Sequence, residues 1–393
     1  MKQLILNPVE NLPYLISYAE DVQVKGLYVS DKDKTEQTVM ASKIGFSGRG
    51  DYNQKIHQIY KEWSEALGVQ HLSMRLLSGL HAHIIIFMGI GNIGDKVLLL
   101  PEAAGGHYAT KGILERLGYY VIEMAVDNQN YCIDIPETIH IIKTEHPDFI
   151  FVDRSEGINY EEFGELLKYT DKKICSIFDA SQYLTNIIYH QFPSPFDMGF
   201  DIILSTLHKN FPGPQKALVC SQENSPYWQR IQKGMSDYVS SLHVENVLYA
   251  GEILRHGNLL NQYSKIMLEN SICLENYLYE EKIPVVLKNS KVRPTHHIWI
   301  NMNNQENAYR FYKDMETYNL LVNYRKLPYN LGYGIRMGTA AATLQGLNPN
   351  RCRELARLIA KIYYKEQKFT ELKETSQNFI DSLQPLTYPI VQQ

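Results

Sequence analysis

The sequence IILSTLHK, residues 202–209, runs from a short apolar segment into a lysine. A second apolar segment, ICSIF at residues 174–178, ends in Asp179, which lies 30 residues before Lys209. Short apolar runs that end in polar residues are typical of buried strands. We therefore expect Asp179 and Lys209 to lie at, or just beyond, the ends of two strands of one sheet.

Similar segments recur between Lys96 and about Val219, and stretches with helical periodicity separate them. The strand-like segments are 97–100, 120–125, 149–152, 174–178, 202–204 and 217–220. This alternation predicts an α/β fold with a mostly parallel central sheet and helices on both faces. Such sheets bind ligands at the carboxyl ends of their strands, where Asp179 and Lys209 are expected.

The chemistry of these two side chains favours one cofactor. Lysine forms Schiff bases with pyridoxal phosphate, and a carboxylate can keep the pyridine nitrogen protonated so that the ring accepts electrons. Lys209 and Asp179 are thus predicted to hold pyridoxal 5'-phosphate. On spacing alone, an ordinary surface lysine remains an alternative for Lys209.

The pattern divides the chain into three parts. Residues 1–50 are expected to form an N-terminal arm, and residues 51–240 a large cofactor-binding domain. Residues 241–393 read as a long linking helix and a smaller α+β domain, with a polar tail after Thr370 that gives no clear element. In this reading, one helical stretch covers residues 238–281.

Composition excludes several classes of partner. The net charge of -4 gives no electrostatic reason to bind nucleic acid or an anionic membrane. No apolar stretch is long enough to span a bilayer, and the apolar run at the N-terminus is too short for a signal peptide. The five cysteines are scattered without a C-x-x-C pair, which favours reduced thiols in a cytoplasmic protein.

A glycine-rich segment and several histidines are not expected to bind a nucleotide or a metal ion. GIGNIG at residues 89–94 spells a nucleotide-binding motif, but a helix-like run precedes it and a strand follows, so we predict a helix-to-strand turn. The histidines His81, His83, His296 and His297 have no carboxylate or cysteine at metal-ligand spacing, and no metal site is predicted.

Three further positions could bind a ligand. Ser78 and Gly79 open a predicted helix, whose first N–H groups suit a phosphate. His107 follows two glycines just after a predicted strand, where its ring could pack on a flat cofactor or simply be a core or surface residue. Arg336, among small residues, suits a carboxylate, although a structural salt bridge would also explain it.

Taken in order, these motifs resemble serine hydroxymethyltransferase, a fold-type I pyridoxal-phosphate enzyme, from near residue 7 to about residue 360. Residues 205–214, STLHKNFPGP, are similar to the family's T-T-T-H-K-T-L-x-G-P-R-G. Residues 179–182, DASQ, resemble its D-x-A-H, with Gln182 in place of the histidine. The resemblance implies that Lys209 carries the cofactor beside Thr206 and His208, and that Asp179 is the partner of the pyridine nitrogen.

The other matches assign the remaining cofactor contacts. Residues 105–107, GGH, match the motif whose histidine stacks on the ring, and LSGL at 77–80 resembles the phosphate loop H-S-G-S. Ser155 lines up with a serine near the phenolic oxygen. IQKG at 231–234 resembles I-Q-G-G, which implies that Gly234 contacts the phosphate of a neighbouring subunit. GIRMGT at 334–339 resembles G-L-R-I-G-T, so Arg336 would bind the substrate's α-carboxylate.

The N-terminal arm departs from the family. Residues 42–52, SKIGFSGRGDY, are similar to Y-A-E-G-Y-P-G-K-R-Y-Y, but Ile44 replaces the glutamate that handles the substrate hydroxyl's proton and touches folate. Ser42 replaces the first tyrosine, and Tyr52 keeps the last. Glu10 is the nearby arm carboxylate, and Gln215 replaces the arginine of G-P-R-G. Because isoleucine cannot exchange a proton, folate-dependent transfer is not expected.

The resemblance implies a homodimeric enzyme with a shared active site, in which Tyr52 and Gly234 come from the partner. We expect the amine of an α-amino acid to displace Lys209, giving an external aldimine and then a quinonoid, with aldol or retro-aldol chemistry between Cα and Cβ. Arg336, Tyr52 and Glu10 would bind the substrate. The alternatives are decarboxylation, substitution or transamination of a larger amino acid in secondary metabolism, true serine/glycine hydroxymethyltransfer, and a non-catalytic binding protein with this fold.

Overall fold

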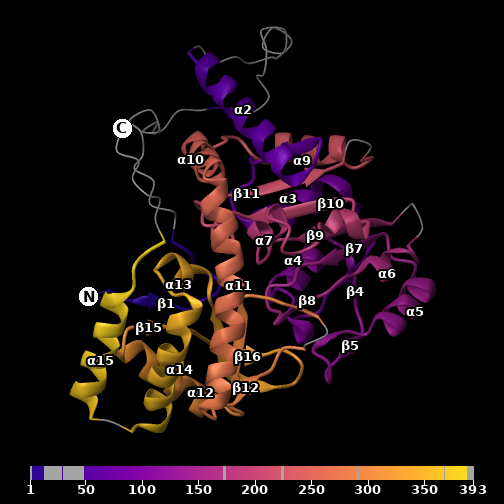
Figure 1. Cartoon of the computed structure of the whole chain (residues 1–393). Helices are drawn as coiled ribbons and strands as arrows, with labels where there is room; N and C mark the ends of the chain where they lie inside the picture. Colours follow the sequence, from indigo (N-terminus) through magenta and orange to yellow (C-terminus); the bar gives the residue numbers. More distant parts are fainter. Residues whose placement is uncertain are drawn as a thin grey trace.

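The computed structural model describes residues 2–12, 29, 48–170, 174–222, 225–289, 292–366 and 368–386. Ser42 and Ile44, which carry the altered arm motif, lie outside these residues. The described chain forms a large part around a central sheet and a smaller part with its own sheet, and helix α11 (Gly257–Glu280) runs along both (Figure 1).

The central sheet has seven strands in the order β2-β11-β10-β9-β7-β3-β4. Their bounds are β2 His71–Ser73, β11 Ala217–Ser221, β10 Ile202–Thr206, β9 Cys175–Asp179, β7 Phe149–Val152, β3 Lys96–Leu99 and β4 Tyr120–Glu123. β11 is antiparallel to both of its neighbours, and the other pairs are parallel. The predicted mostly parallel sheet is therefore confirmed.

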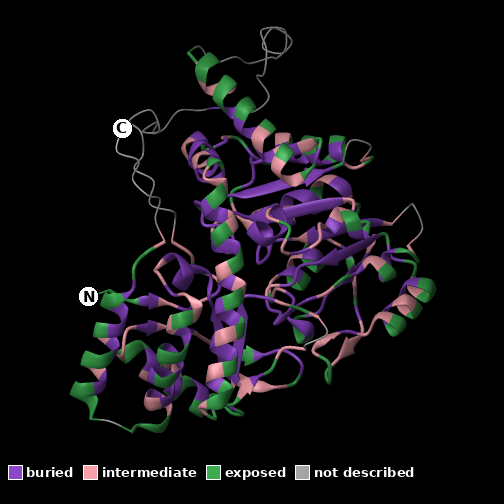
Figure 2. Ribbon diagram, viewed as in Figure 1, coloured by how far each residue is buried: buried purple, intermediate pink, exposed green. Residues whose placement is uncertain are grey.

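Alternating side chains of the strands pack against two different sets of helices. Val97 and Leu99 belong to an apolar cluster with α3 (Gly79–Ile90) and α9 (Trp228–Tyr238). Leu98 instead joins a second cluster with α7 (Leu184–Ile188) and α10 (Val244–Arg255). Since the strands are apolar on both faces, both faces are covered, as Figure 2 shows for the buried strands of the sheet.

The remaining helices of the large part connect or flank these strands. They are α2 Gly50–Leu67, the 3-10 turn η2 Glu102–Ala104, α4 Thr110–Arg116, α5 Ile135–Glu145, α6 Gly164–Leu167 and α8 Pro195–Met198. Three short strands, β5 Val126–Asp127, β6 Cys132–Ile133 and β8 Asn159–Tyr160, lie outside the main sheet.

Two helix predictions need correction. One of the predicted helical stretches between the strands, at residues 161–169, yields only the short helix α6, Gly164–Leu167. The single stretch predicted for residues 238–281 is two helices, α10 and α11, which meet at His256. Gly257 follows that junction, and glycine weakens a helix because it loses the most backbone freedom on folding.

The smaller part is built on an antiparallel four-stranded sheet in the order β12-β14-β17-β16. Its elements are β12 Val285–Val286, β14 His297–Asn301, β16 Asn323–Leu327, β17 Gly332–Gly338, α12 Gln305–Thr317, α13 Ala340–Leu344, α14 Pro349–Tyr364 and α15 Phe369–Ser382. A short strand β13, Arg293–Pro294, pairs with β8 of the large part. Helix α14 packs along α11.

Both ends of the described chain join this smaller part. β1 (Leu4–Ile5) pairs in parallel with β15 (Leu320–Leu321), so the first residues are a strand of the C-terminal part rather than only an arm. The polar tail contains α15, which buries Leu372, Phe379 and Ile380 against the apolar core of the smaller part. No helix was predicted for this tail, because most of its residues are polar.

The GIGNIG segment lies between α3, which ends at Ile90, and β3, which begins at Lys96. The prediction of a helix-to-strand turn is therefore confirmed, and Gly94 has a φ of 92° that favours glycine. None of the described helices is long and apolar enough to cross a membrane.

Candidate active site

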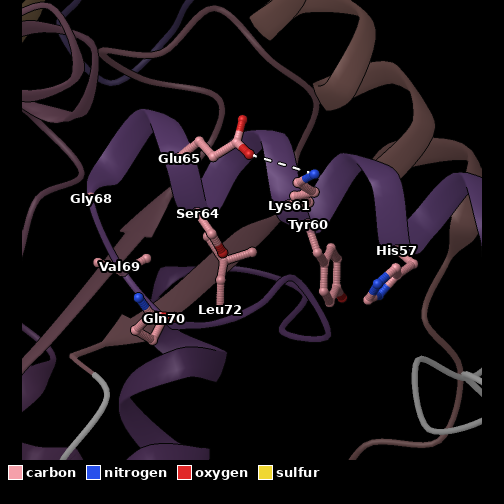
Figure 3. A pocket seen from close by; sticks show the side chains of 9 residues that line it. All are labelled: His57, Tyr60, Lys61, Ser64, Glu65, Gly68, Val69, Gln70 and Leu72. Atoms are coloured by element: carbon pink, nitrogen blue, oxygen red, sulfur yellow. Dashed lines mark ion pairs between the residues drawn. The ribbon is translucent and has the colours of Figure 1, made fainter.

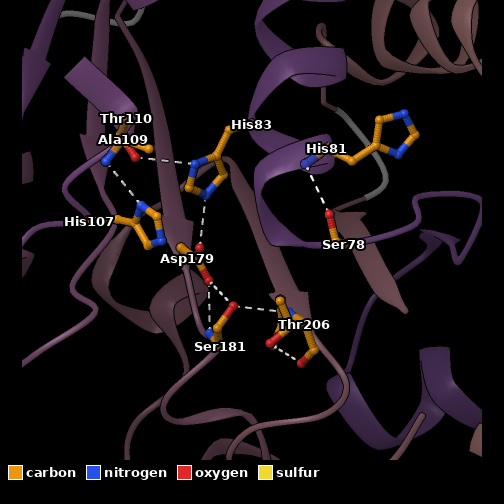
Figure 4. A network of polar contacts seen from close by, with 10 residues as sticks. Ser78, His81, His83, His107, Ala109, Thr110, Asp179, Ser181 and Thr206 are labelled. Carbon is orange, nitrogen blue, oxygen red and sulfur yellow. Dashed lines mark hydrogen bonds and ion pairs between the residues drawn. The ribbon is translucent and has the colours of Figure 1, made fainter. Parts of the chain in front are cut away.

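Asp179 is the last residue of β9, at the carboxyl edge of the central sheet. Its Oδ2 lies 2.9 Å from His83 Nε2, and its Oδ1 accepts hydrogen bonds from the Ser181 backbone N–H, at 2.8 Å, and the Ser181 hydroxyl (Figure 4). Burial alone would raise the pKa of Asp179, but the bonds from His83 and Ser181 outweigh it and lower that pKa. Asp179 is thus an ionised carboxylate at neutral pH.

His83, on the buried face of α3, fixes the position of that carboxylate. The Thr110 hydroxyl lies 3.3 Å from its Nδ1, and its ring packs edge-on against Phe151 with centroids 4.9 Å apart. The sequence reading considered His83 only as a metal ligand. His83 follows His81 by two residues and therefore lies on a different face of the helix, but no local pattern shows which strand that face meets.

Lys209 lies in the loop after β10 and is partly buried. Desolvation, aided by repulsion from Arg336, lowers the pKa of Lys209, while Asp179 and Asp153 oppose the effect. The side-chain amide of Asn11 donates a 2.6 Å hydrogen bond to the Lys209 carbonyl, which ties the first residues of the chain to this loop. The sequence reading did not identify Asn11 as a positioning residue.

Thr206 and His208 precede the lysine in the chain. The Thr206 backbone N–H donates to the Ser181 hydroxyl oxygen at 2.9 Å, which joins the end of β10 to the Asp179 network. Thr206 Oγ1 and His208 Nδ1 are buried without a hydrogen-bond partner among the described residues. Desolvation and the charge of Lys209 lower the pKa of His208 to about 4, so its ring is neutral.

Ser78 and Gly79 begin helix α3 next to the end of β10. Ser78 is the N-cap, and its Oγ accepts a hydrogen bond of 3.3 Å from the His81 backbone N–H. A Cβ on Gly79 would lie 2.9 Å from Thr206 Cγ2, so only glycine allows this close approach. The helix start therefore presents N–H groups beside Thr206, the geometry expected of a phosphate seat.

His107 follows a glycine pair that the backbone requires. A Cβ on Gly105, whose φ is 91°, would lie 1.9 Å from the Glu156 carbonyl oxygen, and one on Gly106 would lie 2.3 Å from that of Leu100. Desolvation, with the charges of Lys209 and His83, lowers the pKa of His107 to about 4. The neutral ring accepts a 3.2 Å hydrogen bond at Nδ1 from the Ala109 N–H.

Arg336, on β17, faces a buried glutamate. Its Nη1 lies 3.4 Å from Glu156 Oε1, and the same oxygen contacts Nη1 of Arg325 on β16. Glu102 lies 3.8 Å from Arg325 at the exposed side. Desolvation lowers the pKa of Arg336 to about 10, and that of Arg325 to about 10 with added repulsion from Arg336. The sequence reading missed Glu156 and Arg325.

The other predicted site residues lie in different surroundings. Ser155 is partly buried next to Glu156. Gly234 lies inside α9 rather than in a loop, and a Cβ there would be 3.0 Å from the Cα of Gly89 in α3. Packing of two helices accounts for this glycine, and its contact with a partner's cofactor stays a prediction.

The two arm residues with expected substrate contacts lie at the periphery. Glu10 is exposed, and Tyr52 lies in the first turn of α2, partly buried against the core of the large part. Helix α2 extends from the molecule beyond the sheet, as Figure 1 shows. Their contacts with a substrate also stay predictions.

Several buried polar atoms near Lys209 form no hydrogen bond within the described part of the chain. They are Thr206 Oγ1, His208 Nδ1, Gln182 Nε2, Arg336 Nε and both carboxylate oxygens of Asp153. Buried polar groups normally have partners, so this cluster suits a polar ligand. A lysine, an ionised carboxylate, a helix start and an arginine are the groups that pyridoxal phosphate and an amino acid require, so the residues fit this cofactor.

Two other observations concern the described residues. No group of three or more His, Cys, Asp or Glu side chains there is placed to hold a metal ion. A hollow of about 580 Å³ lies between α2 and the start of β2, where Lys61 and Glu65 form an ion pair of 3.9 Å at its rim (Figure 3). It is lined by His57, Tyr60, Lys61, Ser64, Glu65, Gly68, Val69, Gln70 and Leu72, none of which belongs to the site around Lys209.

The sequence has recognisable relatives. The serine hydroxymethyltransferase of Pyrobaculum calidifontis is 25% identical over 315 residues, which cover 77% of this chain and 73% of its own length. That of Saccharolobus solfataricus is 26% identical over 336 residues, covering 82% of this chain and 77% of its own. The chain is a distant relative of the serine hydroxymethyltransferases. No protein-family model matches it.

A solved structure extends the comparison to the fold. The L-threonine transaldolase from Pseudomonas fluorescens, in its internal aldimine state, matches with a TM-score of 0.89 and 20% identity, covering 98% of this chain and 88% of that one. The predicted fold-type I architecture is confirmed. Together with the serine hydroxymethyltransferase relatives, it also confirms the predicted class, a pyridoxal-phosphate-dependent enzyme.

Proposed function

We propose that this protein is a pyridoxal-phosphate-dependent transferase or lyase that makes or breaks the Cα–Cβ bond of an α-amino acid, by aldol or transaldol chemistry. One observation carries the proposal: Lys209 lies within electrostatic reach of both the ionised Asp179 and Arg336. These are the three charged groups that such an enzyme needs for cofactor attachment, for the pyridine nitrogen and for the substrate carboxylate.

This chain has residues that could bind each part of the cofactor. Lys209 Nζ would form the Schiff base, and its lowered pKa favours the unprotonated amine that this bond requires. The Asp179 carboxylate would hold the proton at the ring nitrogen, while His83 and Ser181 keep it in place. Ser78 and Gly79 would bind the phosphate, and the neutral ring of His107 would cover one face of the cofactor.

Bound pyridoxal phosphate supplies an electron sink for the pair released when a bond at Cα breaks. The chain's own residues decide which bond that is. Arg336 would hold the α-carboxylate and so fix the orientation of Cα. Lys209, once released from the cofactor, can accept or return a proton at Cα, because its lowered pKa makes it a better base near neutral pH.

The charges around Arg336 favour an amino acid with a single carboxylate. Arg336 and Arg325 carry two positive charges, and Glu156 and Glu102 carry two negative ones. One incoming carboxylate already makes this group negative. A second carboxylate on the substrate's side chain would meet Glu156 with no spare cation, which disfavours dicarboxylic amino acids.

The assembly is proposed to be a homodimer with a shared site. Tyr52 lies in the first turn of α2, a helix that extends beyond the sheet, and a partner's site is where we expect it to contribute. The expected cytoplasmic location rests on the five scattered cysteines and stays a prediction.

Reconstitution and a substrate screen test the proposal. The purified protein incubated with pyridoxal phosphate should gain a visible absorption band, and it should release an aldehyde from β-hydroxy-α-amino acids without added tetrahydrofolate. Exchange of that aldehyde for a second one would specify transaldol chemistry. A protein that takes up no pyridoxal phosphate, or that cleaves serine only with tetrahydrofolate, would contradict the proposal.

A further inference from the structure

Asp153 is a buried carboxyl group beside the cofactor site that the proposed function does not use. It follows directly on β7 and is 2% exposed. In the sheet Val152 pairs with Phe178, so that the next residues of the two parallel strands, Asp153 and Asp179, lie at the same carboxyl edge. Two aspartates on neighbouring strands thus point to one region.

The two carboxyl groups have opposite surroundings. Asp179 has His83 and Ser181 as partners. Neither oxygen of Asp153 has a well-aligned hydrogen-bond partner, and no ion pair joins Asp153 to a cation within the described part of the chain. The Thr110 hydroxyl and the His107 backbone lie close enough to lower its pKa. The adjacent Arg154 is engaged elsewhere, with Glu161 at 2.5 Å. An ionised carboxylate that is buried without a partner costs several kcal/mol, whereas the neutral acid does not.

The charged and polar groups that face Asp153 come from strand β9, helix α4, the loop before α4 and the loop after β10. Burial and the negative charge of Asp179 on β9 favour the neutral acid, while Thr110 of α4 and the His107 backbone oppose them. Asp153 also acts on Lys209, in the loop after β10. The balance raises the pKa of Asp153 well above its ordinary value. When their surroundings shift the pKa values of two nearby carboxyl groups in opposite directions, one can be neutral while the other is ionised. Enzymes commonly use such a pair for two different roles.

We propose that Asp153 is a neutral carboxylic acid whose O–H donates a hydrogen bond to the phenolic oxygen of pyridoxal phosphate, which rests on the proposed function. A neutral acid has one donor, and the oxygens of Asp153 have no well-aligned partner among the described residues. Asp179 is the proposed partner of the ring nitrogen. The anionic phenolic oxygen is then the acceptor on the ring for the O–H of Asp153. Asp153 is then a cofactor contact in addition to Ser155.

This hydrogen bond has a defined effect on the Schiff base of Lys209. The phenolic oxygen attracts the proton of the Schiff base, and a donor to that oxygen weakens the attraction. A neutral Asp153 therefore lowers the pKa of the Schiff base. An ionised Asp153 would do the opposite, because a nearby negative charge stabilises the protonated form. The two protonation states predict shifts of opposite sign.

The protonation state is tested first without cofactor. Infrared spectra of the apoprotein at pH 7 should show the C=O band of a neutral carboxylic acid that Asp153→Asn removes. Asp127→Asn is the control, because hydrogen bonds from Asn130 and Gln129 lower the pKa of Asp127 and keep it ionised. A spectrum that Asp153→Asn leaves unchanged in this region would overturn the proposal, whether or not the protein binds pyridoxal phosphate.

The hydrogen bond is tested by titrating the visible band of the loaded protein. Asp153→Ala should raise the pKa of the Schiff base by about one unit, the size of one charge-assisted hydrogen bond. Asp153→Asn, which stays neutral and keeps a donor, should leave it nearly unchanged. A lowered pKa in both variants would show an ionised Asp153, and an unchanged pKa in Asp153→Ala would show no contact; each overturns the proposal. If Asp153→Ala does not fold, a lowered pKa in Asp153→Asn still decides against it.

Discussion

The cofactor end and the substrate end of this site are built in different ways. At the cofactor end, Asp179 of β9, His83 of the adjacent helix α3 and Ser181 all belong to the large part and are joined by hydrogen bonds. At the substrate end, Arg336 and Arg325 of the smaller part share the single carboxylate of Glu156 from the large part. The first end is held by local packing, and the second depends on how two parts of the chain meet.

This difference separates attachment of the cofactor from choice of substrate. Groups that pack together within the large part keep their positions as long as that part is folded. Charges that meet across two parts of a chain can change with the position of either part. Variants of the two ends are therefore expected to give different readouts: spectra of the bound cofactor for the first, and stability and substrate affinity for the second.

The largest effect is expected for Lys209→Ala at the cofactor end. Without the amine that forms the Schiff base and acts as a base, activity should fall by at least roughly 10²–10⁴-fold, and the visible band should be lost. The exposed Lys313→Ala is the matched control and should change neither absorbance nor activity. A Lys209→Ala protein that keeps both would mean that another lysine holds the cofactor.

Glu156→Gln is the corresponding change at the substrate end. It leaves the buried Arg336 and the partly buried Arg325 facing a neutral group, and loss of one partner of a buried ion pair costs about 3–5 kcal/mol of unfolding free energy. Glu102→Gln removes the exposed partner of Arg325 and should cost less than about 1 kcal/mol. Urea denaturation measures both. Equal losses in the two variants would show that Glu156 does not hold the arginines.

Arg336→Lys tests the carboxylate clamp without removing a charge. A lysine cannot form the paired hydrogen bonds of a guanidinium, and one bond to a charged group contributes about 1.5–3 kcal/mol, or roughly 10–150-fold in kcat/KM. We expect a higher KM with an unaltered visible band. If the band is lost while KM is unchanged, Arg336 acts on the cofactor end instead.

The smallest effect is expected for His83→Ala. Asp179 has a lowered pKa in the folded protein, so its contribution is present at neutral pH and is lost as the pH falls through that pKa. Without the hydrogen bond from His83, the pKa of Asp179 moves up. The lowest pH at which the protein retains its cofactor, measured from the visible band, should therefore rise. If this pH is the same in the variant, His83 does not stabilise the Asp179 carboxylate.

The sequence predicted much of the cofactor end because its signals are local. Strand β7 was predicted with its observed bounds, and β9 and β10 within two residues, since apolar runs mark them directly. Lys209 and Asp179 each follow such a run, and two glycines precede His107. Each of these residues is recognisable from its immediate neighbours.

The substrate end was only partly predictable. Arg336 was found through its motif, but Glu156 and Arg325 have no local pattern, and only the meeting of β16 with the segment after β7 brings them together. The same holds for Asn11, whose contact with the Lys209 loop joins the first residues of the chain to the large part. His83 and Asp153 gain their importance from burial at a shared sheet edge, which composition and spacing do not reveal.

The central claim, that Lys209 carries pyridoxal phosphate, has one direct test. The loaded protein is reduced with borohydride, which fixes a Schiff base as a stable amine, and is then digested and analysed by peptide mass spectrometry. The account predicts one pyridoxyl group, on the peptide that contains Lys209. A modification on another lysine, or on none, would contradict it.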